Sequence, residues 1–164
     1  MSSQPQKGLI QSMKWTSKDI TVFEQSKEYI DTVVIPLIPI DFSTNIKQTA
    51  ALGEYINILS NELERQFKGR IILLPSYTYL TSSDQKGKVT AINEYVKHLT
   101  ENEIKHVFFL TSDNFWNGVA SEINEAKVMW LPSIPLEDME EKYKQKIITD
   151  QMNQLLPIFI QKWQ

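Results

Sequence analysis

Polar side chains that could do chemistry follow the four apolar runs in this chain, and Ser133 follows the last of them. Each run has the composition of a buried strand. In parallel sheets ligands bind beyond the carboxyl ends of the strands, so these side chains would meet at one edge. They are Asp41, Ser43 and Thr44; Ser76 and Tyr77; and Thr111, Ser112, Asp113 and Asn114. Hydroxyl and carboxylate oxygens could bind a small polar ligand or a hard cation. The same residue types also cap helices and form turns, and this alternative stays open.

Motifs of the common catalytic sites are absent from the sequence. There is no Gly-x-Gly-x-x-Gly, no P-loop and no Gly-x-Ser-x-Gly elbow. The lack of cysteine excludes disulfides, thiolate zinc sites and thiol nucleophiles. His98 falls inside a predicted helix and His106 at the entrance of a predicted strand, away from the expected site. We therefore predict no catalytic residue, metal site or cofactor, although a two-carboxylate mechanism through Asp41 and Asp113 stays formally open.

Aromatic residues at two places suggest contact with a partner. Phe115 and Trp116 directly follow a polar strand exit, where exposed rings would contact a partner or stack on a ligand. The chain ends in an apolar segment that contains Phe159 and Trp163. This segment must pack on the sheet or on a second subunit, so a homo-oligomer or a protein partner is expected. Pro157 should kink the last helix or restart it.

The apolar runs predict the fold class. Thr32–Leu37 has no polar interruption after its first residue, which is typical of a strand buried on both faces. Similar runs follow at Ile71–Pro75, Val107–Leu110 and Val128–Pro132, with amphipathic segments between them. Strands that alternate with helices imply parallel pairing and right-handed crossovers. We predict a three-layer α/β/α sandwich with a mainly parallel four-stranded sheet, Rossmann-like in arrangement.

Two local features refine this prediction. Because proline cannot donate to a ladder, Pro36 and Pro39 predict that the first strand is paired only over Thr32–Ile35. The polar segment Ser76–Lys88 is interpreted as a long loop.

Whole-chain properties limit the number of domains and the class of partner. With 164 residues, a net charge of −3 and 41% hydrophobic residues, one domain is expected. We interpret residues 1–12 as a disordered leader and residues 13–164 as a single α/β domain. No basic stripe suggests nucleic acid, and no apolar run approaches the roughly 20 residues of a membrane helix. No signal peptide is visible, so a cytoplasmic protein is expected.

Three stretches of the chain resemble the YpiF-type proteins of spore-forming Gram-positive bacteria. They are Met13-Lys14-Trp15, Glu28-Tyr29-Ile30-Asp31-Thr32 and the Val34–Ile40 segment Val-Ile-Pro-Leu-Ile-Pro-Ile. The resemblance covers nearly everything from Met13 onward. That family is small and uncharacterised, so the resemblance implies a bacterial cytosolic protein and supplies no site residue.

A second, weaker likeness is to the creatininase-type amidohydrolases. Their strands also end in a proline before a ligand loop, as in Val34-Ile35-Pro36 and Leu73-Leu74-Pro75. A later strand opens into a loop where this chain has Leu110-Thr111-Ser112-Asp113-Asn114. Those enzymes hold divalent metals with Glu, His and Asp, whereas the expected histidines and the Glu-x-His-Gly stretch are missing here. This likeness implies a creatininase-like scaffold without its metals.

Two hypotheses for the function follow from the sequence. The favoured one is a non-catalytic protein-interaction or self-associating domain, because catalytic histidine and cysteine are missing and the C-terminal segment is apolar. The alternative is a small-molecule-binding domain or a divergent hydrolase with its site at the carboxyl ends of the strands. An open pocket holding Asp41 and Asp113 would favour the alternative, whereas buried or capping aspartates would favour the first hypothesis.

Overall fold

The central strand of the sheet is β1 (Thr32–Ile40), seen here in a computed structural model that describes residues 12–164. Val33 and Ile35 pack into the core on one face of the sheet, and Val34 and Ile38 pack into the core on the other. Because successive side chains point to opposite faces, a strand that is covered on both faces needs apolar residues throughout. This double burial explains the uninterrupted apolar run.

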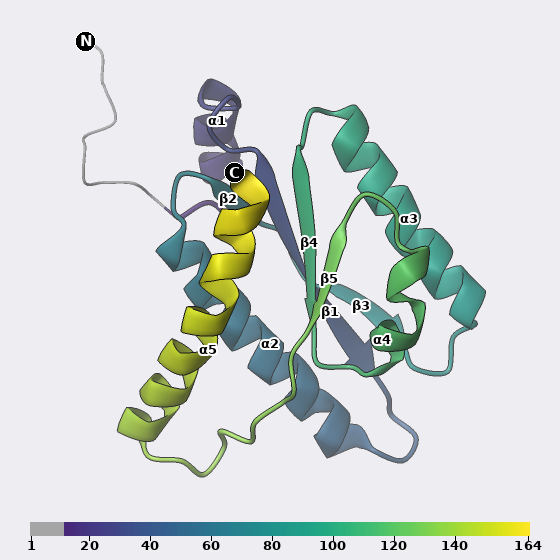
Figure 1. The fold of residues 1–164 in the computed structure, drawn as a ribbon. Coiled ribbons are helices and arrows are strands. Elements are labelled where there is room, and N and C mark those ends of the chain that lie inside the picture. Colours follow the sequence, from purple (N-terminus) through teal and green to yellow (C-terminus); the bar gives the residue numbers. More distant parts are fainter. Residues whose placement is uncertain (1–11) are drawn as a thin grey trace.

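All strands of the sheet are parallel. β2 (Ile71–Leu73) and β3 (Tyr77–Leu80) pair with one side of β1, β4 (His106–Thr111) pairs with the other side, and β5 (Lys127–Trp130) lies outside β4 (Figure 1). The predicted α/β class with a parallel sheet is confirmed, but the sheet has five strands instead of four. The additional strand, β3, lies within the segment for which the sequence predicts a loop. Only one of its four side chains is buried, so it leaves little hydrophobic pattern.

β1 stays paired across both of its prolines, so the prediction that pairing stops before Pro36 is wrong. Pro36 is in register with β4, and Pro39 is in register with β3. Even-numbered residues of β1 direct their backbone groups toward β2 and β3, since the Val34 carbonyl accepts from the Leu74 N–H. The nitrogen of Pro36 therefore points toward β2 and β3, at the break between these two strands. The nitrogen of Pro39 points toward the side of β4, but β4 has already ended at this position. Neither proline removes a ladder hydrogen bond.

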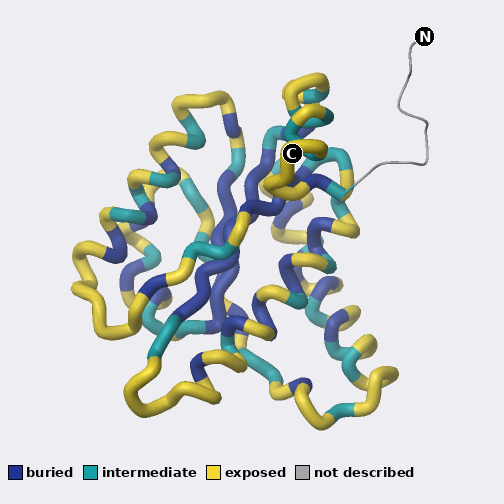
Figure 2. Tube along the Cα trace, turned by 180° about the vertical axis from the view of Figure 1, so that it is seen from behind, coloured by how far each residue is buried: buried dark blue, intermediate teal, exposed yellow. Residues whose placement is uncertain are grey.

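Helices cover both faces of the sheet, which gives three layers (Figures 1 and 2). One face is covered by α2 (Ile46–Gln66) and α5 (Glu141–Trp163). The other is covered by α1 (Ser17–Gln25), α3 (Gln85–Glu101) and α4 (Phe115–Val119), which continues into the 3-10 turn η1 (Ala120–Glu122). Buried residues concentrate in the strands between these layers, as Figure 2 shows. None of the helices in residues 12–164 is long and apolar enough to cross a membrane.

The C-terminal helix α5 packs on the sheet beside α2. Its buried side chains recur every three or four residues, at Ile148, Met152, Leu155 and Phe159. The ring centroid of Phe159 lies 4.0 Å from that of Phe108 in β4. The helix runs through Pro157 without restarting. Of the two alternatives for the apolar C-terminal segment, packing on the sheet is the one observed.

The described chain begins beside the sheet. Apart from Ser12, the leader predicted over residues 1–12 lies outside the described residues. Met13 is buried, and its carbonyl accepts a hydrogen bond from the Leu73 N–H of β2 at 2.9 Å. Lys14 forms a parallel bridge with Leu73, so this short segment covers the outer edge of β2.

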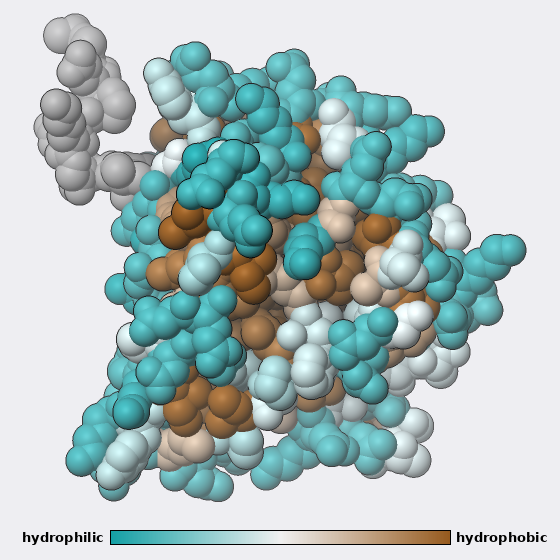
Figure 3. Space-filling model, in the orientation of Figure 1, coloured by the Kyte–Doolittle hydropathy of each residue, from teal (hydrophilic) through white to brown (hydrophobic). Residues whose placement is uncertain are grey.

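β5 is the outer strand at the opposite edge. It pairs with β4, and Trp130 on it is 38% exposed. Figure 3 shows apolar surface between α5 and α3, on the face where β5 lies.

Candidate functional site

The predicted residues at the end of β4 form a hydrogen-bond network around Asp113. The Tyr79 hydroxyl donates to Asp113 Oδ2 at 2.6 Å, and the Phe115 N–H donates to Oδ1 at 3.0 Å. Trp116 Nε1 donates to the Tyr79 hydroxyl at 2.8 Å, and the Asp113 N–H donates to Thr111 Oγ1 at 3.0 Å. Asp113 thus caps the start of α4 and anchors β3 through Tyr79. Both carboxylate oxygens are engaged inside the protein.

Burial and the neighbouring carboxylate keep the Tyr79 hydroxyl protonated. Burial raises the pKa of Tyr79 most, and the hydrogen bond and charge of Asp113 raise it further. Lys88 of α3 packs nearby, with its Nζ 4.0 Å from the centre of the Phe115 ring. That nitrogen also donates to the Thr81 carbonyl at 3.2 Å. Tyr79 is therefore a hydrogen-bond donor to Asp113 at neutral pH.

Asp41 forms a separate turn at the end of β1. Its Oδ1 accepts hydrogen bonds from the Ser43 hydroxyl and, at 2.7 Å, from the Ser43 N–H. These two bonds, the hydroxyl first, lower the pKa of Asp41. Within residues 12–164, no hydrogen bond links this turn to the Asp113 network. Each aspartate organises its own stretch of backbone.

The other predicted strand-exit residues are spread over separate positions. The Ser76 hydroxyl donates to Asn57 Oδ1 of α2 at 2.9 Å. The Ser112 hydroxyl is buried and has no partner among the described residues. Thr44 and Asn114 are exposed. The predicted set is thus divided between the Asp113 network, the Asp41 turn and these isolated positions.

The aromatic residues predicted to contact a partner are packed within the chain. Trp116 and Phe159 are fully buried, and Phe115 and Trp163 are partly buried. Trp163 Nε1 donates to Thr32 Oγ1 at 2.8 Å, which ties the end of α5 to the start of β1. These rings hold α4 and α5 on the sheet.

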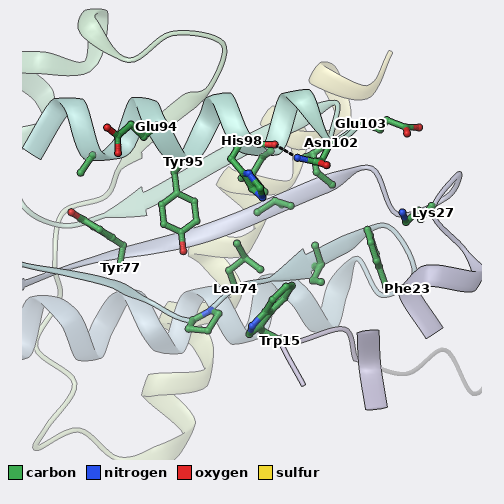
Figure 4. A pocket seen from close by; sticks show the side chains of 16 residues that line it. Trp15, Phe23, Lys27, Leu74, Tyr77, Glu94, Tyr95, His98, Asn102 and Glu103 are labelled. Atoms are coloured by element: carbon green, nitrogen blue, oxygen red, sulfur yellow. Dashed lines mark hydrogen bonds between the residues drawn. The ribbon is translucent and has the colours of Figure 1, made fainter. Parts of the chain in front are cut away.

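A cavity of about 820 Å³ opens on the face of the sheet that α1 and α3 cover. We call it the α1–α3 cleft (Figure 4). Val33 of β1 and Ile72 of β2 form its floor, together with Leu74 at the break between β2 and β3. The cleft therefore lies where the strand pairing beside β1 is interrupted.

Four aromatic side chains contribute to the lining of the α1–α3 cleft. They are Trp15, Phe23, Tyr77 and Tyr95. The rings of Tyr95 and Tyr77 meet edge to face, with centroids 6.2 Å apart, and Tyr77 stacks on Tyr79 at 6.3 Å. Tyr79 in turn meets Trp116 edge on at 5.4 Å. A continuous row of rings thus connects the cleft with the Asp113 network.

Polar side chains also line the α1–α3 cleft, namely Lys27, Glu94, His98, Asn102 and Glu103. In Figure 4, the Tyr95 hydroxyl and the His98 imidazole project from α3 toward the opposite wall, where Trp15 and Leu74 lie. No hydrogen bond joins the His98 ring to a carboxylate in the described part of the chain. Residues 12–164 also hold no group of three His, Cys, Asp or Glu side chains placed to bind a metal ion. The lining suits the binding of an apolar molecule.

Tyr77 is the one predicted site residue that lines the cleft. Trp15, Tyr95 and His98 also line the cleft and were not predicted as site residues, because they come from segments far apart in the chain. Each looks like an ordinary amphipathic position within its own segment. The available signal was the three-residue spacing of Tyr95 and His98, which puts both on one face of α3.

Comparison with known proteins places the chain in a family without an assigned function. Residues 21–163 match the family described as "Protein of unknown function (DUF2487)". The sequence is 38% identical over 154 residues to the uncharacterized protein YpiF of Bacillus subtilis (strain 168), a match that covers 92% of this chain and 98% of YpiF. No solved structure matches the chain. The resemblance to YpiF-type proteins is confirmed, and the chain belongs to the DUF2487 family of proteins of unknown function.

Proposed function

We propose that this chain is a non-catalytic binding domain and that the α1–α3 cleft holds its ligand. The observation that carries the proposal is the cleft of about 820 Å³ with its aromatic lining. Ligand pockets typically measure about 300–1,000 Å³ and are lined by apolar and aromatic side chains with a few polar groups. The size and lining of this cleft therefore support a small organic ligand.

The side chains of the cleft indicate an apolar ligand with an aromatic ring. Trp15 is 61% exposed, so a ring stacked on its indole would remove a large apolar area from water. The Tyr95 hydroxyl and the His98 ring could each hydrogen-bond a polar substituent. The lining carries a lysine, Lys27, and two glutamates, Glu94 and Glu103, so charges of both signs are present and the lining does not favour a highly charged ligand.

A thermal-shift screen of aromatic fragments tests this proposal when it includes a variant that fills the cleft. Ala91 lines the cleft from α3, so Ala91→Phe would occupy part of its volume. Lys97→Phe adds the same ring at an exposed position of α3 outside the cleft and is the matched control. A ligand present at about 100 times its Kd stabilises a protein by roughly 2.7 kcal/mol. For a chain of this size, that free energy raises the Tm by about 5–10 °C.

We expect fragments that raise the Tm of the wild-type and Lys97→Phe proteins but bind Ala91→Phe at least about 10-fold more weakly, a loss of roughly 1.4 kcal/mol. Fragments that stabilise all three proteins equally would contradict a site in the cleft. The variant Asp113→Ala would then show whether the strand-exit site predicted from the sequence binds them.

Protein interaction or self-association is the second candidate function, and the edge strand β5 supports it. Within the described residues β5 pairs with β4 alone, so its outer edge offers backbone groups to another strand. Trp130 is partly exposed on this strand, and apolar surface lies nearby (Figure 3). The apolar stripe of α5 gives no further support, because the sheet already covers it.

Light scattering after size-exclusion chromatography tests association at β5. If the protein is a dimer through this edge, Trp130→Lys should convert it to a monomer, because the lysine brings a charge into the contact. Tyr143→Lys, at an exposed position of α5, should leave the dimer intact. A monomer at every protein concentration, or a dimer that survives Trp130→Lys, would count against self-association at this edge.

The cytosolic location expected from the sequence is also a proposal. Fractionation of cells that carry a tagged full-length chain tests it, and recovery in the membrane fraction would argue against it.

A further inference from the structure

Glu64 of α2 is a buried carboxylate whose partners are incomplete. Its exposed fraction is 1%, and its Oε2 accepts a hydrogen bond from the Met13 N–H at 2.8 Å. Its Oε1 is buried and has no partner among the described residues. The Ser60 hydroxyl, one helical turn earlier, is also buried and without a partner in this part of the chain. The N-terminal segment thus crosses α2 above two polar groups that are not fully hydrogen-bonded.

In the part of the chain that the structure describes, no cation lies in direct contact with Glu64. Burial raises the pKa of Glu64, the Met13 N–H lowers it, and the more distant charges of Lys14 and Lys68 lower it further against the opposing charge of Asp19. No ion pair within 4.0 Å reaches Glu64 from the described residues. A buried carboxylate that is held by one neutral donor is costly, since ionised groups in protein interiors are normally paired.

The nitrogen of Met13 is fixed in front of this carboxylate. The Met13 side chain is 2% exposed in the core between α1, α3 and the sheet. Its carbonyl is held by the Leu73 N–H of β2, and the Lys14 bridge follows directly. Among the described residues, these contacts orient the Met13 nitrogen toward Glu64.

We propose that Glu64 is a binding site for the free α-ammonium group of a chain that begins at Met13. In such a chain the nitrogen that now donates one neutral hydrogen bond would carry a positive charge and three N–H donors. One N–H could remain on Oε2, and the others could reach the unpartnered Oε1 and the Ser60 hydroxyl. Because residue 13 is a methionine, a start of translation at its codon would produce this form. The ion pair would lock the segment that brings Trp15 to the α1–α3 cleft, although the inference does not depend on the proposed function of the cleft.

Two chains that differ by one residue test the inference. Residues 13–164 and residues 12–164 are released from a cleavable fusion, so that the first has its α-ammonium group at Glu64 and the second keeps a neutral amide there. The full chain serves as a further reference with the neutral amide. At pH 7 we expect the Tm of 13–164 to exceed that of 12–164 by at least about 3 °C. Glu64→Gln keeps the shape of the side chain and removes its charge, so it should abolish this difference.

The pH dependence of this Tm difference provides a second readout. Pairing with Glu64 should raise the pKa of the α-amino group above its ordinary range of about 7.7–8.0. The extra stability should be lost as the pH rises through the raised pKa of the amine, and it should also be lost at low pH, where Glu64 becomes protonated. Lys14, Lys68 and Asp19 are present in both chains, so their own titration cancels in the comparison. Equal Tm values at pH 7, a difference that persists in Glu64→Gln, or failure of 13–164 to fold would each overturn the inference.

Discussion

At the scale of single residues, the Tyr79 hydroxyl connects Trp116 with Asp113 and is the hydrogen-bond partner of the Trp116 indole N–H. The hydroxyl accepts from the buried Trp116 Nε1 and donates to Asp113. Tyr79→Phe would leave the indole N–H unpaired in the core, and an unsatisfied buried donor costs about 1–3 kcal/mol. We expect the free energy of unfolding to fall by that amount, as measured by urea denaturation.

The matched control for this substitution is Tyr143→Phe, because Tyr143 is 52% exposed on α5. Removing a solvated hydroxyl should change the stability by less than about 0.5 kcal/mol. If Tyr79→Phe is as mild as Tyr143→Phe, the network around Asp113 does not stabilise the fold.

Glu64 should make the stability of the full chain depend on pH. Burial raises the pKa of Glu64 above the ordinary value of 4.5. A carboxyl group with a higher pKa in the folded state stabilises the fold below its unfolded pKa, and this contribution is lost as the pH rises through the folded pKa. We therefore expect Glu64→Gln to remove a loss of stability that the wild type shows as the pH rises above about 4.5. Urea unfolding over a pH series measures this loss, and identical pH profiles for the two proteins would contradict it.

At the scale of elements, Gly53 allows α2 to approach β1. A Cβ at this position would lie 2.6 Å from Ile38 Cγ2, a branched side chain held in the core. Gly53→Ala should therefore destabilise the protein by roughly 1–3 kcal/mol through overpacking, despite the better helix propensity of alanine. Thermal or urea unfolding measures the effect.

Gly87 provides the comparison, since it lies in the first turn of α3 and its added Cβ would meet only Asp84, at 3.7 Å or more. Gly87→Ala should be neutral or stabilise by up to about 1 kcal/mol. The packing of α2 on β1 would be less tight than described if both alanine variants gained stability.

The strands show how far the sequence predicts an element. β1 and β4 are predictable because burial on both faces demands apolar residues at every position. β3 is not predictable from the sequence. It pairs with the part of β1 that extends past the end of β4, and Tyr79 is its single buried side chain, so it leaves no apolar run. The prolines of β1 led to a wrong prediction of where its pairing ends. A proline's missing N–H disrupts pairing only on the side of the strand where a neighbouring strand would accept that hydrogen bond.

At the scale of the whole molecule, the α1–α3 cleft depends on contacts that no local pattern encodes. Trp15, Tyr77 and Tyr95 belong to three segments, and only the folded sheet brings their side chains together. The positions of the strand exits could be predicted, because the end of each apolar run is visible in the sequence. The hydrogen bonds of the strand-exit residues could not be predicted, because partners such as Tyr79 and Asp113 are 34 positions apart in the sequence.

The central claim, a ligand site in the α1–α3 cleft, is tested most directly by NMR. Amide chemical-shift changes would be mapped on ¹⁵N-labelled full-length protein during titration with a stabilising aromatic fragment. We predict that the largest changes fall at residues that line the cleft, among them Ile72, Ala91 and His98, and that they vanish in Ala91→Phe. Changes centred on Asp41 and Asp113, or along β5, with the cleft unaffected, would contradict the account.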